Sequence, residues 1–385
     1  MKKQVFGASM AKVFVAVAAI SLFAGCADVT SDESEEETQK ARAQDLRQSD
    51  SDSTGKASHT LQYATDIGKA PGDYTFSGSR ALTADRVPIL TAEEMAFNGW
   101  CTTINRKKTT IAPGFVANSD MQLSAQWKEC KIGDIVTNNG AIITTDCFLK
   151  YKNDIKAAGI ICRLANGTRK MLALGLKESS NDMYWMQDNI KVPAIESTVY
   201  ISGKTEPTFQ RDIDGVDNYD EIVKAGGNVS AQNNAFYYAK HYGESNQLSG
   251  TLADGWFIPT AEEMYYLIRE YMTVQKSYTL IGSSEPLFDA ISDQGRVSSI
   301  YWTSSYYDYF HPKDTYAFQY VFAINDKEYT EIKKVVPNLN AEPKDYYGYA
   351  SKSGSFKSNG ETINFAVIKT RRAHATARTV VLHEL

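Results

Sequence analysis

The sequence predicts an α+β protein of short, mostly antiparallel strands with two helices and long loops. Three observations predict it. Asn139-Gly140 and Asn166-Gly167 each separate two short apolar runs, and Asn-Gly pairs favour tight hairpin turns. The stretch GWFIPTAEEMYYLIREY combines a helix-start signal with the apolar spacing of an amphipathic helix. Near the end of the sequence, aromatic and β-branched residues alternate with polar ones, as in half-buried strands.

Length and charge set the first limits on organisation and function. A chain of 385 residues is longer than one hydrophobic core usually supports, so more than one domain is expected. The formal net charge of -5 argues against nucleic acid as a partner, because binding phosphates requires a basic face. The 23 tyrosines point to a folded chain with a large aromatic content.

Residues 1–26 read as an export signal. Lysines at the start precede the apolar run VFVAVAAISLFA, which is too short to span a bilayer. The ending LFAGC resembles the lipobox of bacterial lipoproteins, which implies that Cys26 is acylated and becomes the new N-terminus. Phe23 stands where leucine is usual, so a soluble secreted form is the alternative. We therefore expect a lipid-anchored envelope protein that contacts the membrane through Cys26, at the outer membrane and exposed on the surface.

Residues 27–70 are expected to form a disordered acidic and polar tether. The segment SDESEEE contains five acidic residues within seven, and the following residues lack apolar periodicity. Such a segment cannot bury enough surface to offset the entropy of ordering.

Residues 71–129 are expected to form a small β module. Short apolar pieces alternate with turn signals at Asn98-Gly99, Pro113-Gly114 and Asn118-Ser119. The segment resembles the internalin-type B repeat, which implies a β-grasp-like fold and a role as a spacer or a partner-binding module. The resemblance rests on Phe97, Gly99, Trp100, Cys101, Thr102, Ile111, Gly114, Leu123, Ala125, Gln126 and Trp127.

Residues 130–385 are expected to begin with strands and to continue with two helices. KIGDIVTNNGAIIT and AAGIICRL…RKMLALGL each predict a hairpin. NNAFYYAKHYG has helical spacing and is expected to end at Gly243. Thr260 and Glu263 form a capping box, which places the start of the second helix at Ala261. Met264, Leu267, Ile268 and Tyr271 then fall on one face.

The rest of this region is expected to consist of strands and long polar loops. SIYWTSSYYD, YAFQYVFAI and RTVVLHEL are rich in aromatic and β-branched residues and predict strands. Residues 333–361 read as a long exposed loop, and binding sites are often carried on such loops.

The order of these blocks resembles a bacterial family with a C-type-lectin-like fold, typified by the Legionella collagen-like protein C-terminal domain and the Fibrobacter major paralogous domain. GWFIPTAEEM and YWTSS are the strongest marks, and Arg371, Arg372 and Arg378 approximate its arginine-bearing last strand. The resemblance implies that Trp256, Pro259 and Trp302 are structural. The usual glycine before the last strand is not evident.

RDIDGVDNYDE contains a candidate calcium site. Asp212, Asp214 and Asp217 lie close together in sequence, and calcium binds several carboxylate oxygens on a tight loop. The glycine is fourth rather than sixth as in an EF-type loop, and the segment also reads as a solvated turn leading into a helix. The calcium-binding blocks of sugar-binding C-type lectins are absent, so calcium-dependent sugar recognition is not expected.

The sequence contains no recognisable set of catalytic residues, so we expect no enzyme and no cofactor. No hydrolase, zinc-protease or phosphate-loop motif occurs, and the five histidines are scattered. Enzymes of the formylglycine-generating type need a reactive cysteine pair late in the chain, and no cysteine follows Cys162. Cys101, Cys130, Cys147 and Cys162 remain, as disulfides or as buried free thiols.

The functional hypothesis is based on the tyrosines. Tyrosine gives a large contact area at little cost in rotamer entropy, so it is frequent in recognition loops. We expect noncovalent binding of an unidentified glycan, protein or peptide, in the manner of an adhesin. The candidate side chains are Tyr306, Tyr307, Tyr309, Tyr346 and Tyr347. The alternatives are a structural envelope protein without a specific ligand and, third, an enzyme on a formylglycine-generating-type scaffold.

Overall fold

The computed structural model confirms the α+β class: mixed sheets predominate and the helices are few and short. The signal sequence, Cys26 and the acidic segment lie outside the part of the chain that the structure describes. The described residues are 56–186, 190–201, 207–283, 300–308, 315–323, 350–358, 361–371 and 376–385.

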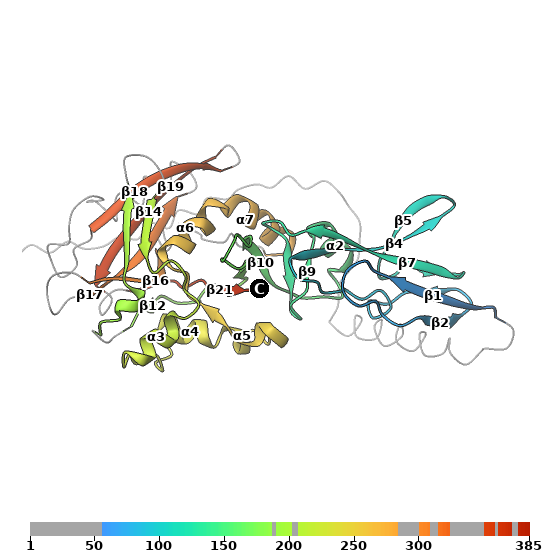
Figure 1. The fold of residues 1–385 in the computed structure, drawn as a ribbon, viewed down its shortest axis with the longest axis horizontal. Coiled ribbons are helices and arrows are strands. Elements are labelled where there is room, and N and C mark those ends of the chain that lie inside the picture. Colours follow the sequence, from blue (N-terminus) through green and yellow to red (C-terminus); the bar gives the residue numbers. More distant parts are fainter. Residues whose placement is uncertain are drawn as a thin grey trace, which may run out of the picture. The chain divides into compact units, whose positions relative to one another are not determined.

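One sheet of 11 strands runs through most of the described chain (Figure 1). Its path is β15 (Trp256–Phe257), β21 (Leu382–Glu384), β11 (Leu172–Gly175), β10 (Ala157–Arg163), β8 (Ile135–Thr137), β9 (Ile142–Ile143), β4 (Met95–Ile104), β7 (Met121–Glu129), β1 (Ser58–Ala64) and β2 (Tyr74–Ser77), with β5 (Lys107–Ile111) beside β4. Two short strands, β3 (Arg80–Ala81) and β6 (Val116–Ala117), pair with each other outside it.

Strand β1 corrects the predicted tether, because it lies within residues 27–70. It pairs in parallel with β7 and antiparallel with β2. Leu61 is fully buried, and the ring of Tyr63 lies 5.3 Å from that of Trp100 in an edge-on contact. The apolar positions of SHTLQYA are few, but their period of two places them on the core face.

One of the three turns expected in the β module is a bulge instead. Gly99 lies inside β4, where the register shifts between Phe97 and Trp100, and its φ is 102°. The chain reverses later, at Asn105-Arg106, where φ is 50° and 64°. Two consecutive positive φ values match the right-handed twist of a two-residue hairpin.

No break separates residues 71–129 from those that follow. The apolar core around Trp100 also contains Ile135, Ile143, Phe148 and Tyr151. The described residues from Ala57 onward belong to a single compact unit. The boundary predicted at 129/130 is therefore crossed by both the sheet and the core.

The strands β8, β10 and β11 are buried on both faces. Ile160 packs with Leu267 of helix α6 (Ala261–Arg269), whereas the next residue, Ile161, belongs to the cluster of Phe236 in helix α4 (Ala235–Lys240). Successive strand residues point to opposite faces, so helices are needed on both sides. Figure 1 shows α6 and α7 (Tyr271–Leu280) on one side of this part, and α4 and α5 (Tyr242–Ser245) on the other.

The predicted hairpins and the capped helix are confirmed. β8 pairs with β9, and β10 with β11, around Gly140 and Gly167, which have φ of 87° and 61°. Thr260 caps α6 reciprocally with Glu263, and the helix begins at Ala261. Trp256 and Trp302 are buried, as expected of structural residues.

The predicted end of a helix at Gly243 is wrong. α4 ends at Lys240, and Gly243 lies inside the following α5. A Cβ there would stand 2.3 Å from the Ala253 carbonyl oxygen, so close packing explains this glycine. Helix α2 (Thr145–Tyr151) was not predicted, whereas α3 (Asn218–Lys224) lies where the acidic turn was expected to lead into a helix.

A separate antiparallel sheet has the order β16-β17-β19-β18. Its strands are β16 (Ile300–Asp308), β17 (Thr315–Ala323), β18 (Ala350–Ser358) and β19 (Glu361–Arg371). β18 falls within residues 333–361, which the sequence had assigned to an exposed loop. The remaining elements are β12 (Met183–Tyr184) paired with β20 (Thr376–Ala377), the hairpin of β13 (Ser197–Ile201) and β14 (Pro207–Arg211), and the 3-10 turns η1 (Pro193–Ile195) and η2 (Gly250–Ala253).

Candidate functional site

Tyr306 is not an exposed binding residue. Its side chain is 1% exposed, and its hydroxyl accepts a hydrogen bond of 2.9 Å from the Val192 amide. Its ring lies 6.5 Å from that of Trp185. The register of β16 shifts between Trp302 and Tyr306. The expectation that Tyr306 is exposed is therefore wrong, because its side chain belongs to the core.

The other candidate tyrosines are not brought together by the described structure. Tyr307 lies in β16, where it pairs with Tyr316 of β17. Tyr309, Tyr346 and Tyr347 lie outside the described residues.

The acidic loop leads into helix α3, and no group of three or more His, Cys, Asp or Glu side chains within the described residues is arranged to hold a metal ion. Asp212, Asp214 and Asp217 therefore do not form a ligand set. Asp212 instead accepts a hydrogen bond of 3.0 Å from Asn218 Nδ2. Burial, together with the charges of Asp217 and Asp214, raises the pKa of Asp212 to about 7.

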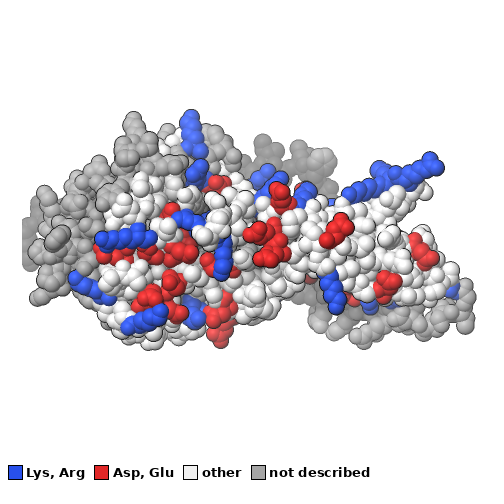
Figure 2. Space-filling view, viewed as in Figure 1, with Lys and Arg blue, Asp and Glu red and all other residues white. Residues whose placement is uncertain are grey.

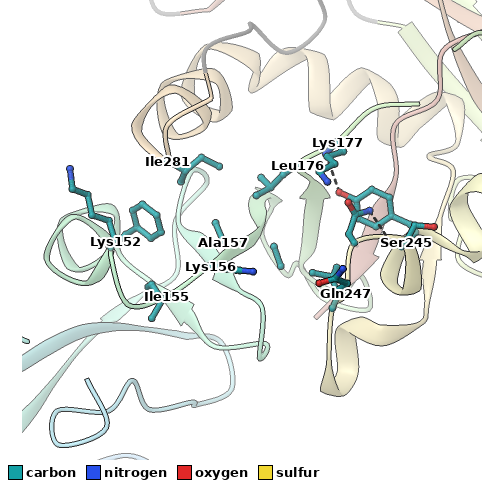
Figure 3. A pocket seen from close by; sticks show the side chains of 14 residues that line it. Lys152, Ile155, Lys156, Ala157, Leu176, Lys177, Ser245, Gln247 and Ile281 are labelled. Atoms are coloured by element: carbon teal, nitrogen blue, oxygen red, sulfur yellow. Dashed lines mark hydrogen bonds between the residues drawn. The ribbon is translucent and has the colours of Figure 1, made fainter. Parts of the chain in front are cut away.

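The described structure contains a cleft of about 500 Å³ between the start of the central strands and helix α5 (Figure 3). It draws on four segments that are far apart in sequence, and we call it the lysine cleft. Its lining includes Phe148, Lys152, Ile155, Lys156, Ala157, Leu176, Lys177, Tyr242, Ser245, Asn246, Gln247, Leu248 and Ile281.

Three tyrosine hydroxyls fix one wall of the lysine cleft. The Lys177 amide donates to Tyr242 Oη, and Tyr238 Oη donates to the Lys177 carbonyl, both at 3.0 Å. Tyr278 Oη donates to the Leu176 carbonyl, also at 3.0 Å. Burial raises the pKa of Tyr238 and Tyr242 well above its usual value, so both remain neutral hydrogen-bonding groups. These tyrosines position the Lys177 backbone.

Helix α5 and the turn after it form the facing wall. Asn246 Nδ2 donates to the Tyr242 carbonyl at 2.9 Å. Gln247 has a φ of 54°, a conformation that costs energy for a residue other than glycine. This turn directs Gln247 toward the centre of the cleft in Figure 3.

The remaining wall follows helix α2. The amide of Asn138 donates to the Lys156 carbonyl at 2.9 Å, which ties this segment to the β8–β9 hairpin. In Figure 3, Lys156 extends toward Gln247, whereas Lys152 points outward from the other labelled side chains. Ile155 and Lys156 also line a neighbouring cleft of about 450 Å³.

The lining of the lysine cleft is positively charged and carries no carboxylate, because its charged residues are Lys152, Lys156 and Lys177. None of these three ammonium groups forms an ion pair with any residue that the structure describes. Apolar side chains, Leu176 and Ile281 among them, also line the cleft. A cationic, partly apolar cleft in a chain of net charge -5 is suited to an anion with an apolar body.

The four described cysteines are free and buried, so no disulfide joins them. Burial raises the pKa of Cys130, Cys147 and Cys162 to about 12. A thiol with such a pKa is a poor nucleophile near neutral pH. These three cysteines therefore act as small core residues.

The sequence reasoning missed the lysine cleft. Its only local signal is the run FLKYKNDIKAAG, in which Lys152 and Lys156 flank a turn. Lys177, Tyr242 and Ile281 join them only through packing of distant segments, and no residue spacing encodes that.

Comparison with family models, with curated proteins and with solved structures finds no match for this chain. Among the described residues, no helix has both the length and the apolar character needed to cross a membrane.

Proposed function

We propose that this protein is a lipid-anchored protein of a bacterial envelope, acylated at Cys26, that binds an anionic ligand noncovalently in the lysine cleft. The observation that carries the binding proposal is the set of three lysines without ion-pair partners in the described structure, in a cleft whose lining holds no carboxylate. The proposal keeps the binding role inferred from the sequence and moves its site from the tyrosine-rich segments to the cleft.

The finer fold assignments belong to the same proposal. The parallel pairing of β1 with β7, beside the antiparallel β4, supports a β-grasp-like module. The GWFIPTAEEM and YWTSS blocks, with Trp256 and Trp302 buried, support a C-type-lectin-like region after it. We assign no catalytic role, and a structural envelope protein without a ligand remains the alternative.

The test of the binding proposal compares three probes that share one apolar body. Octanoate and octyl sulfate carry an anion, and octanol is uncharged. By calorimetry, the full chain should bind the two anions and not octanol, with an affinity that falls as salt is added. Lys156→Gln should weaken anion binding by about tenfold, since a charge-assisted contact contributes about 1.4 kcal/mol or more.

A matched control is Lys128→Gln, because Lys128 is an exposed lysine of β7 outside the cleft lining. This variant should bind as the unaltered chain does. Equal binding of octanol, or no effect of Lys156→Gln, would contradict the proposal and favour the structural alternative.

The anchor has its own test. Cys26→Ser should move the chain from the membrane fraction to the soluble fraction of the cells that produce it. Unchanged partitioning into detergent would show that another segment holds the protein to the membrane.

A further inference from the structure

A second hollow lies on the outer face of the β module, away from the lysine cleft. Trp100 and Leu123 point into the core, so their neighbours Cys101 and Ser124, which face each other across β4 and β7, lie on the opposite face. This face bounds a groove of about 720 Å³, which we call the hydroxyl groove.

The hydroxyl groove is lined mainly by side chains that both donate and accept hydrogen bonds. They include Thr103, Asn118, Ser119, Gln122, Ser124 and Gln126. Hydroxyl and amide groups are neutral and offer donors and acceptors side by side. They match a ligand whose own polar groups are also mixed donors and acceptors.

The charges within the groove balance and are already engaged. Its charged lining residues are Lys108 and Asp120. Lys108 Nζ donates to Gln126 Oε1, and Asp120 accepts a hydrogen bond of 2.8 Å from the Thr60 amide. Figure 2 shows basic side chains over the β4–β5 hairpin, but Arg106 and Lys107 at its tip do not line the groove. The groove therefore does not select for a charged ligand.

The groove lies where β4 and β7 diverge. Their pairing ends at Cys101 and Ser124, whereas the lining continues over residues 102–105 and 118–122. Here β4 is paired only with β5, and β7 only with β1. Main-chain groups of both strands therefore border the groove beside the side chains, and a ligand that is dense in hydroxyl groups can use both as donors and acceptors.

Apolar side chains complete the groove. Ile104 is 37% exposed, and Phe115 and Met121 are only partly buried against the module core. A pyranose ring has one polar rim and apolar C–H faces, so it can use these residues and the surrounding hydroxyls together. We propose that the hydroxyl groove binds a neutral oligosaccharide.

The experiment presents the full chain with neutral hexasaccharides of glucose, xylose, mannose and N-acetylglucosamine, and with a hexamer of galacturonic acid. Calorimetry should show saturable binding of at least one neutral hexasaccharide that does not change with salt. Ser124→Arg fills the groove and should lower that affinity at least about tenfold. Gln122→Ala removes an exposed side chain and should lower it about threefold.

Thr75→Arg is the matched control, because Thr75 is an exposed residue of β2 that does not line the groove. It should leave sugar binding unchanged, and so should Lys156→Gln, because Lys156 does not line the groove. Melting curves confirm that each variant is folded, and Gln122→Ala keeps the test open should Ser124→Arg fail to fold. No binding of any neutral hexasaccharide, preferential binding of the galacturonate hexamer, or full binding by a folded Ser124→Arg would overturn the proposal.

Discussion

The lysine cleft and the hydroxyl groove differ in how the chain builds them. The groove lies on the neighbouring strands β4, β5 and β7, with the turns between them, and its polar residues follow from the alternation of one sheet face. The cleft joins the end of α2, the end of β11, α5 and the end of α7, which are far apart in sequence. The groove is therefore a local product of the module, whereas the cleft depends on long-range packing.

This difference has a structural consequence. A change that disturbs the packing of α5 should open or close the cleft without altering the groove, provided that the protein stays folded. The two hollows can therefore be separated by mutation, which would not hold if they formed one continuous binding surface.

The largest effect is expected from Gly243→Ala in α5. The added Cβ would stand 2.3 Å from the Ala253 carbonyl oxygen, so the helix must move away from η2. Overpacking against backbone should lower the free energy of unfolding by about 3 kcal/mol and abolish anion binding in the cleft. Urea denaturation and calorimetry measure the two effects.

Two comparisons complete that prediction. Gly72→Ala introduces the same methyl group where nothing lies within 4 Å, so its unfolding free energy should stay within about 0.5 kcal/mol of the original. Binding of a neutral hexasaccharide by folded Gly243→Ala should persist. Its loss together with anion binding would break the distinction between the two hollows.

The parts that could be predicted from sequence are those with short-range signals. The capping box of Thr260 and Glu263 and the Asn139-Gly140 hairpin depend on a few neighbouring residues, and both are present. Strand β1 was missed because SHTLQYA is stabilised by its partners β2 and β7 rather than by its own composition. Tyr306 was misplaced because only the surrounding fold shows that it is buried.

The candidate site was harder to predict from the sequence than these elements of the fold. The tyrosine content led to a prediction of ligand contact, but Tyr238, Tyr242 and Tyr278 bind backbone groups of the cleft wall. The lysines become part of one cleft lining only through the three-dimensional fold. Residue counts could not distinguish a tyrosine that positions a wall from one that contacts a partner.

An intermediate effect is expected from pH, because the helix that carries the capping box contains a buried acid. Burial raises the pKa of Glu263 to about 8, and the nearby Asp214 and Asp212 add to this, although the Thr260 amide and Arg163 act in the opposite direction. A raised pKa means that Glu263 stays protonated to a higher pH in the folded state than in the unfolded state. Stability is therefore complete below the ordinary pKa of 4.5 and is lost as the pH rises toward about 8.

Urea denaturation should show the unfolding free energy falling continuously between pH 5 and pH 8.5. Glu263→Gln, which keeps an acceptor for the Thr260 amide, should reduce this dependence. Hydrogen exchange sharpens the comparison: if β4 and β7 follow the same pH dependence, the module unfolds together with the region of α6. An unchanged slope in Glu263→Gln would assign the pH dependence to other carboxyls, among them Asp212 and Asp134, whose pKa values burial also raises.

The smallest effect is expected within the lysine cleft itself. Lys152 lines the cleft but points outward in Figure 3, whereas Lys156 points toward Gln247. An ammonium group directed into solvent is screened by water and salt, so Lys152→Gln should change octanoate affinity by less than about twofold. Lys156→Gln should change it by about tenfold. Equal effects of the two substitutions would mean that the anion is attracted by the summed charge of the surface and does not occupy the cleft that the tyrosines hold in place.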